Sequence, residues 1–148
     1  MSTLARLLAA SVTVTCFAAL SLSPAVSASS ARAGALHVAK ECSAYTGAAG
    51  DYCTIVRSSL DVIKAGSRVY YLAALDGNSF DGDIVVYAGN GNAAFGHCKV
   101  DVSTAIGRCT LRGGIGQFKG FRADVVVSPD PTNDVGALWD GTYRFGKR

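Results

Sequence analysis

Residues 113–120 read GGIGQFKG, which places four glycines in eight positions around one aromatic residue. A run of this kind either cradles a phosphate group or turns the chain sharply between two strands. The dinucleotide-binding fingerprint is G-x-G-x-x-G at the start of a helix. Here three residues separate Gly116 from Gly120, and the residues that follow, FRADVVVS (121–128), have the composition of a strand. The stretch therefore predicts a glycine turn between two strands, with Phe118 closing the end of the apolar core.

Short β-prone runs continue on both sides of this turn, and segments rich in Gly, Asp and Asn separate them. The runs span Tyr52–Ser58, Ser67–Leu75, Asp83–Ala88, Gly96–Val102, Arg108–Arg112, Phe121–Ser128 and Ala137–Phe145. Apolar and polar residues alternate within them, so that Ala123, Val125 and Val127, for example, share one face of their strand. This pattern is typical of antiparallel strands that are wetted on one side only, and seven or eight of them can close into a barrel.

The glycine stretch also resembles the GGxGxFxGxR motif of the dirigent and allene oxide cyclase superfamily. The matching residues are Gly113, Gly114, Gly116, Phe118, Gly120 and Arg122. The resemblance covers roughly Tyr52–Phe145 and implies an all-β fold, a single eight-stranded antiparallel β-barrel of the calycin-like, allene oxide cyclase type. We expect the barrel domain to span residues 41–148. It departs from the family at Ala123, where plant members usually carry glycine. The family's catalytic acidic residues match no positions here, so no catalytic residue is assigned.

The family holds hydrophobic ligands inside the barrel and steers their cyclisation or radical coupling mainly by shape. The resemblance therefore implies that this chain binds a small hydrophobic molecule in its lumen and steers such a reaction. Two alternatives remain open, a secreted carrier without turnover and a structural or interaction module whose barrel is filled by its own side chains. Fold alone does not decide among them.

The first 28 residues have the pattern of a secretory signal peptide. Arg6 precedes an uncharged apolar run, and Val26-Ser27-Ala28 offers small residues for cleavage near Ala28. We expect a secreted protein, extracellular or periplasmic, with no stable membrane insertion after cleavage and with residues 29–40 as a flexible lead-in. Without Arg6 the chain carries 13 basic and 11 acidic residues, scattered rather than clustered. This balance argues against nucleic acid as a partner, and the oligomeric state stays open.

Four cysteines lie beyond the signal peptide, and four cysteines allow three pairings. Cys42 and Cys53 are eleven positions apart, as are Cys98 and Cys109, which favours two local disulfide bonds. Structural zinc sites use pairs two to four residues apart, so this spacing argues against zinc.

The chain offers few residues for acid–base or metal chemistry. Its two histidines are His37, in the expected lead-in, and His97, on the polar face of a predicted strand. The acidic stretch DGNSFDGD (76–83) places Phe80 where a calcium-binding loop needs an oxygen ligand, so it is interpreted as a solvated hairpin loop. We expect no metal site, no cofactor and no hydrolytic triad.

Aromatic side chains on the apolar strand faces are the candidates for a ligand site in the lumen. These are Tyr71, Trp139 and Tyr143. Their rings are suited to stack on a flat apolar guest, and the tyrosine hydroxyls to orient it. The alternative interpretation is ordinary core packing.

Overall fold

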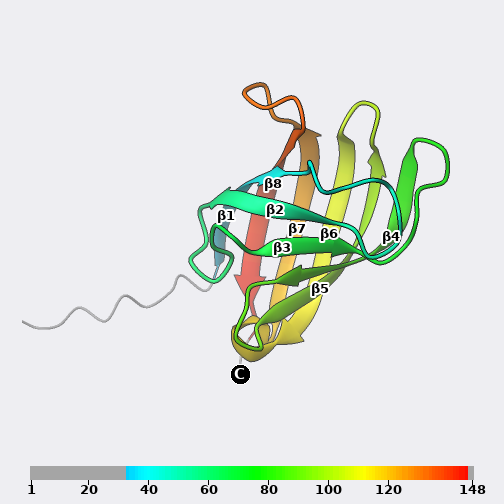
Figure 1. Ribbon diagram of the computed structural model, residues 1–148. Coiled ribbons are helices and arrows are strands. Elements are labelled where there is room, and N and C mark those ends of the chain that lie inside the picture. Colours follow the sequence, from blue (N-terminus) through cyan, green and yellow to red (C-terminus); the bar gives the residue numbers. More distant parts are fainter. Residues whose placement is uncertain (1–32, 147–148) are drawn as a thin grey trace, which may run out of the picture.

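The computed structural model describes residues 33–146, which form a closed antiparallel barrel of eight strands in sequential order (Figure 1). The elements are β1 (Ala33–Glu41), β2 (Tyr52–Ser58), β3 (Arg68–Tyr71), β4 (Ser79–Tyr87), β5 (Ala93–Asp101), β6 (Ile106–Ile115), the 3₁₀ turn η1 (Gly116–Phe118), β7 (Phe121–Pro129) and β8 (Gly136–Phe145). The expected all-β barrel is confirmed. The proposed signal peptide lies outside the described residues.

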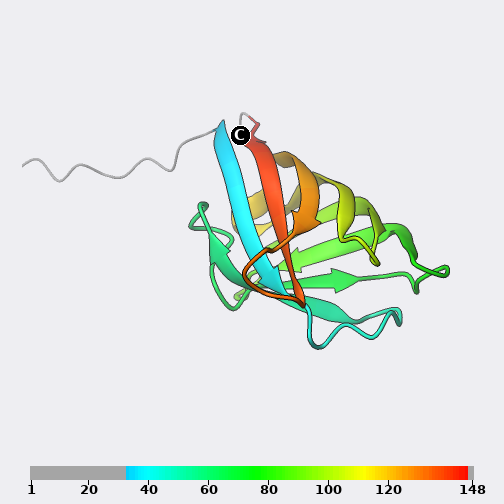
Figure 2. The ribbon, with the colours of Figure 1, turned by 90° about the horizontal axis from the view of Figure 1, so that it is seen from above.

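The first strand corrects the expectation for residues 29–40. Residues 33–40 belong to β1, which pairs with β2 on one side and with β8 on the other and so closes the barrel (Figure 2). The richness of residues 29–40 in alanine and serine favours a flexible segment, yet the run AGALHVAKE forms a strand. Pairing to two neighbours outweighs that weak local preference, since each residue from Ala33 to Glu41 has a ladder partner on β8 and the last four also have one on β2.

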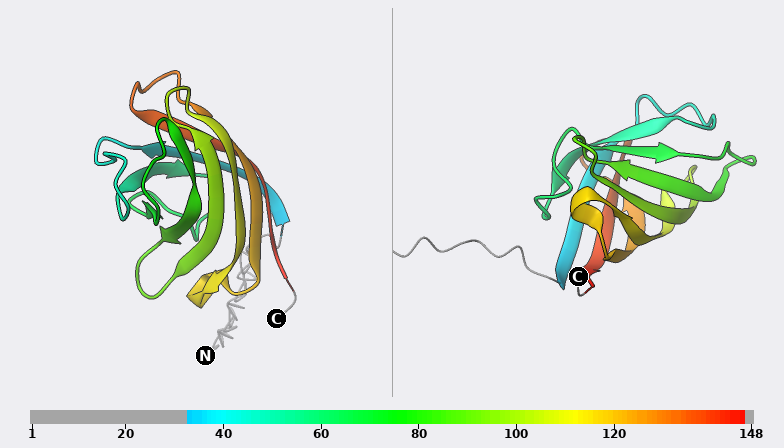
Figure 3. Two further views of the ribbon diagram at one scale, coloured as in Figure 1. Left: turned by 90° about the vertical axis from the view of Figure 1, so that its right-hand side faces the viewer. Right: turned by 90° about the horizontal axis from the view of Figure 1, so that it is seen from below.

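Successive strands are joined by alternating connections at the two ends of the barrel. The rim end comprises residues 42–51, 72–78, 102–105 and 130–135, and the glycine end comprises residues 59–67, 88–92 and 116–120. In Figure 1 the rim end is at the top and η1 is at the bottom beside the end of β8; Figure 3 shows the glycine end from below.

The glycine stretch begins within a strand rather than as a free turn. Gly113 and Gly114 belong to β6, and the β5–β6 register shifts between Ala94 and Gly96, opposite them. Gly113, with a φ of 100°, adopts at this bulge a conformation that favours glycine. Phe118 is fully buried and contacts Phe121 with their ring centroids 5.3 Å apart, as expected for a residue that closes the core.

The loop expected over residues 76–83 is shorter than predicted. Strand β4 already begins at Ser79, so Phe80 points inward and is buried, while Asp81 and Asp83 lie on the outer face. The alternation of Phe80, Gly82 and Ile84 with these aspartates was masked by the turn-prone residues around it. A solvated loop was therefore the wrong interpretation for the second half of this segment.

Both expected disulfide bonds are present, Cys42–Cys53 and Cys98–Cys109. Cys98 and Cys109 are direct ladder partners on β5 and β6, and the turn between these strands is four residues long. Asp101 stabilises that turn by accepting hydrogen bonds from the backbone N–H groups of Ser103 and Thr104. Two disulfides fit an extracellular or otherwise oxidising compartment. None of the helices in the described part is long and apolar enough to cross a bilayer.

Removing the buried bridge between β5 and β6 is expected to lower the free energy of unfolding. We expect the double substitution Cys98→Ala with Cys109→Ala to cost about 2–4 kcal/mol, because the unfolded chain regains the freedom of the closed loop. Urea unfolding followed by circular dichroism measures this cost, with Ser103→Ala as a control in the same hairpin. A loss below about 1 kcal/mol would show that the bridge contributes little beyond the β5–β6 ladder.

Candidate functional site

A cavity of about 230 Å³ occupies the rim end of the barrel. Residues from every strand except β6 and from the rim connections line it: Lys40, Cys42, Tyr45, Cys53, Tyr71, Phe80, Val100, Val102, Ala105, Val127, Asp134, Val135 and Gly136. It is smaller than the roughly 300–1,000 Å³ typical of sites for drug-sized ligands. The walls are mainly apolar, so the few polar groups that face the space determine its chemistry.

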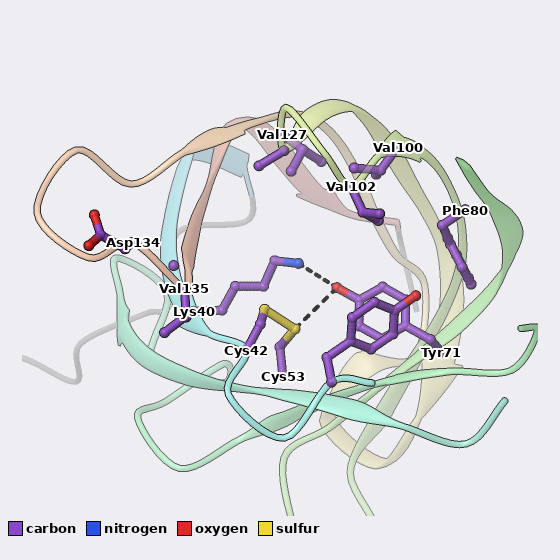
Figure 4. A pocket seen from close by; sticks show the side chains of 13 residues that line it. Lys40, Cys42, Cys53, Tyr71, Phe80, Val100, Val102, Val127, Asp134 and Val135 are labelled. Carbon is purple, nitrogen blue, oxygen red and sulfur yellow. Dashed lines mark hydrogen bonds between the residues drawn. A yellow bond between two sulfur atoms is a disulfide. The ribbon is translucent and has the colours of Figure 1, made fainter. Parts of the chain in front are cut away.

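Lys40 is the central polar group of this cavity (Figure 4). It lies on β1 in alternation with Leu36 and Val38, both of which are buried, and this alternation turns its side chain into the lumen. Its ammonium nitrogen lies 5.2 Å from the ring centroids of both Tyr71 and Trp139. Among residues 33–146, no carboxylate forms an ion pair with it.

Burial without a counter-ion changes the protonation of this amine. Desolvation lowers the pKa of Lys40 from 10.5 to about 7, because the charged form loses its hydration. The aromatic faces of Tyr71 and Trp139 attract the cation, but such contacts offset only part of the hydration free energy that the ammonium loses on burial. Near neutral pH, Lys40 is therefore present both as an ammonium and as a free amine with a lone pair.

Tyr71 connects the amine to the disulfide at the wall. Lys40 Nζ donates a hydrogen bond to Tyr71 Oη, and the Tyr71 hydroxyl donates in turn to Cys53 Sγ at 3.6 Å (Figure 4). The disulfide sulfur carries no proton, which determines the direction of the second bond. Burial raises the pKa of Tyr71 well above its usual value, so its hydroxyl stays protonated.

Tyr45 adds a second phenol to the cavity from the β1–β2 connection. Its ring centroid lies 4.8 Å from that of Tyr71. The Tyr45 hydroxyl is buried and has no hydrogen-bond partner within the described chain. Desolvation is the main cause that raises the pKa of Tyr45 to about 12, so this hydroxyl is a proton donor that lacks an acceptor.

The structure separates the three lumen candidates derived from the sequence. Tyr71 lines the cavity, and Trp139, fully buried, lies directly beneath Lys40's ammonium without lining the cavity. Tyr143 lies toward the glycine end, where its ring stacks with Phe121 at 6.3 Å. Tyr143 is therefore part of the packed core and not of the site, because it is four residues further along β8 than Trp139.

Lys40, Tyr45 and the rim residues were missed in the sequence, for different reasons. A signal for Lys40 existed, because LHVAK places it in register with two apolar residues, but the segment was not recognised as a strand. Tyr45 comes from an irregular connection, whose course no periodicity describes. Asp134 and Val135 are exposed on the β7–β8 connection, and only the closed barrel brings that connection beside Cys42.

The histidines lie outside this site, on the outer surface. His37 Nδ1 is 2.7 Å from Asp140 Oδ1 across β1 and β8, and Ser59 Oγ accepts from the backbone N–H of His37 rather than from its ring. His97 lies between Asp83 and Asp81, whose hydrogen bonds raise its pKa. Within residues 33–146, no group of three or more His, Cys, Asp or Glu side chains is arranged to hold a metal ion.

The comparisons with protein-family models, with curated proteins and with solved structures gave no match. The geometry of the cavity therefore carries the functional argument.

Proposed function

We propose that this barrel binds a small, largely apolar molecule in its rim-end cavity, with an oxygen acceptor of the ligand facing Lys40. The observation that carries the proposal is the fully buried Lys40 amine, which faces an open space without an ionic partner in the described chain. A buried cationic group without a partner is costly for a fold. A ligand that accepts its hydrogen bonds reduces this cost.

The proposal extends to where the protein acts and what it does to its ligand. The two disulfides and the signal-like first 28 residues support export of the chain. The resemblance of residues 113–122 to the dirigent and allene oxide cyclase motif supports a lumen that steers cyclisation or coupling, although only as an analogy of fold. In such a lumen, confinement in a reactive shape would supply most of the rate enhancement.

A structural role is the second candidate, and one observation favours it. The barrel between Trp139 and the glycine end is filled by its own side chains, with Leu36, Phe118 and Phe121 all fully buried. A filled interior needs no ligand to be stable. The two candidates differ only at the rim end, so a test must report on the cavity around Lys40.

Trp139 fluorescence provides this test, because it is the only tryptophan and lies beside the Lys40 ammonium. We expect saturable changes in emission on titration with small phenols and with carboxylates of about six to ten carbons. Lys40→Met should weaken binding about tenfold or more, because it removes a charge-assisted hydrogen bond. Lys99→Met is the matched control on the outer surface, where that side chain is 76% exposed.

A negative result is equally informative. If none of these compounds changes the Trp139 emission or the melting temperature, the structural candidate replaces the ligand-binding one. If binding survives Lys40→Met unchanged, the ligand lies elsewhere and the proposed orientation toward Lys40 is wrong.

A further inference from the structure

The rim-end cavity combines three groups that together suit covalent chemistry at an amine. Lys40 supplies a buried nitrogen, Tyr71 a protonated phenol bonded to that nitrogen, and Tyr45 a second phenol with no partner in the described residues. The Tyr45 hydroxyl is itself buried, and a buried donor without an acceptor is costly. Trp139 lies beneath the Lys40 ammonium, and Phe80, Val100 and Val127 form apolar walls of the space.

We propose that Lys40 is a nucleophile that forms an imine with the carbonyl carbon of a small apolar aldehyde or ketone bound in this cavity. This inference rests on the proposed function, since the carbonyl compound has to enter the same space. It adds the class of ligand and the chemical step.

The step is balanced by groups already in place. The free Lys40 amine forms a C–N bond to the carbonyl carbon while the C=O π pair moves to oxygen. One proton passes from nitrogen to that oxygen, giving a carbinolamine. The oxygen then leaves as water, taking a second proton from the nitrogen through Tyr71 as proton carrier, and a C=N bond remains. Tyr71 ends the step protonated, and no oxidant or reductant takes part.

The protonation of the cavity fits this role. The pKa of Lys40, lowered to about 7, leaves a substantial fraction of free amine at neutral pH. The other titratable groups of the cavity are Tyr45, Tyr71 and Asp134. Both tyrosine pKa values are raised, and Asp134 is exposed on the rim and forms no ion pair with Lys40.

A carboxylate ligand that pairs with the Lys40 ammonium is the competing occupant. It would have to leave water for a mainly apolar space, and that desolvation offsets much of the attraction to the ammonium. A neutral carbonyl compound avoids this cost.

Reductive trapping tests the proposal directly. The probe is benzaldehyde with sodium cyanoborohydride, which reduces an imine to a stable secondary amine, and peptide mapping by mass spectrometry locates the adduct. At pH 7 we expect Lys40 to be trapped at least about tenfold faster than Lys64, Lys99 and Lys119, which are exposed on the outer surface. Lys40→Arg should remove this fast adduct, and Lys99→Arg should retain it.

The pH profile distinguishes a nucleophile from a residue that is merely accessible. Trapping at Lys40 should rise between about pH 5 and 7 and then level off, because the pKa of this amine is lowered to about 7. Tyr71→Phe, which keeps the ring but loses the proton carrier, should slow trapping at Lys40 by about tenfold or more. A rate of trapping at Lys40 that keeps rising up to pH 10 would overturn the assignment.

Benzyl alcohol separates the failure of this inference from the failure of the proposed function. It has the size of benzaldehyde but no carbonyl group, and Trp139 fluorescence reports its binding. If benzyl alcohol binds and benzaldehyde gives no preferential adduct at Lys40, the imine proposal is wrong, whereas the proposed ligand binding in the rim-end cavity is supported. If neither compound binds and all lysines are trapped alike, both proposals fail.

Discussion

Lys40→Met should stabilise this protein at pH 6 by about 1–4 kcal/mol, an uncommon result for a substitution in a barrel lumen. At that pH the amine is mostly an ammonium, fully buried and without an ionic partner in the described chain. Methionine has a similar length and fills the same space without a charge. Tyr71 keeps its hydrogen bond to Cys53 Sγ, so few polar groups are left unpaired. Urea unfolding followed by circular dichroism measures the gain.

The same substitution should change how stability depends on pH. The pKa of Lys40 is about 7 in the folded state, against 10.5 for a lysine side chain in water. Between these values the unfolded chain binds more protons, so the stability of the natural protein rises from about pH 7, by up to tenfold in the folding equilibrium constant per pH unit. Above about pH 10 the raised pKa values of Tyr45 and Tyr71 act in the opposite direction, and stability falls.

Lys40→Met should lack the rise in stability between about pH 7 and 10. The stability curves of the two proteins should therefore converge toward about pH 10. The raised pKa of His97 makes stability fall, rather than rise, with increasing pH. That imidazole lies on the surface and is present in both proteins, so its effect cancels when the two stability curves are subtracted. If Lys40→Met is less stable than the natural protein at pH 6, the buried Lys40 ammonium does not destabilise the fold.

Gly116→Val should destabilise the barrel by about 3 kcal/mol, the largest loss that we expect at the glycine stretch. Gly116 has a φ of 62°, a conformation that valine adopts only under strain. A Cβ at this position would also overlap Asn92 Oδ1 and approach the backbone of Gly91, so the β4–β5 connection would have to move. Asn92 Oδ1 accepts from the backbone N–H of Gln117, and this contact would be lost as well.

Two alanine variants separate the causes. Gly113→Ala meets no atom within 4 Å but retains a φ of 100°, so it reports on backbone strain alone, at about 1 kcal/mol. Gly114 does not have a positive φ, but a Cβ at this position would overlap the carbonyl oxygen of Ala93 and press on Phe118. Gly114→Ala therefore reports on the close packing of the β6 backbone against Ala93 and Phe118. If Gly116→Val unfolds at the same urea concentration as the natural protein, these glycines are not conformational requirements.

The local periodicity of the chain identified most of the barrel. Seven runs were recognised, because alternation of apolar and polar residues is a property of each strand by itself. Strand β2 was predicted with its observed bounds. Strand β3 ends at Tyr71, four residues before the predicted Leu75, whereas β4 and β6 extend into turn residues such as Asp81 and Gly113. Equal spacing also pointed to both disulfides, since a hairpin brings nearby cysteines opposite each other.

By itself the sequence determined the all-β class, the strand faces, the cysteine pairs and the glycines at the bends, because each follows from backbone geometry over a few residues. Only the tertiary structure decided where the site lies. Lys40 and Tyr71 are on strands β1 and β3, which do not pair with each other, and only closure of the barrel brings Lys40 against Tyr71 and over Trp139. The pKa of Lys40 is likewise a tertiary property, since its desolvation depends on walls that come from strands far apart in the sequence.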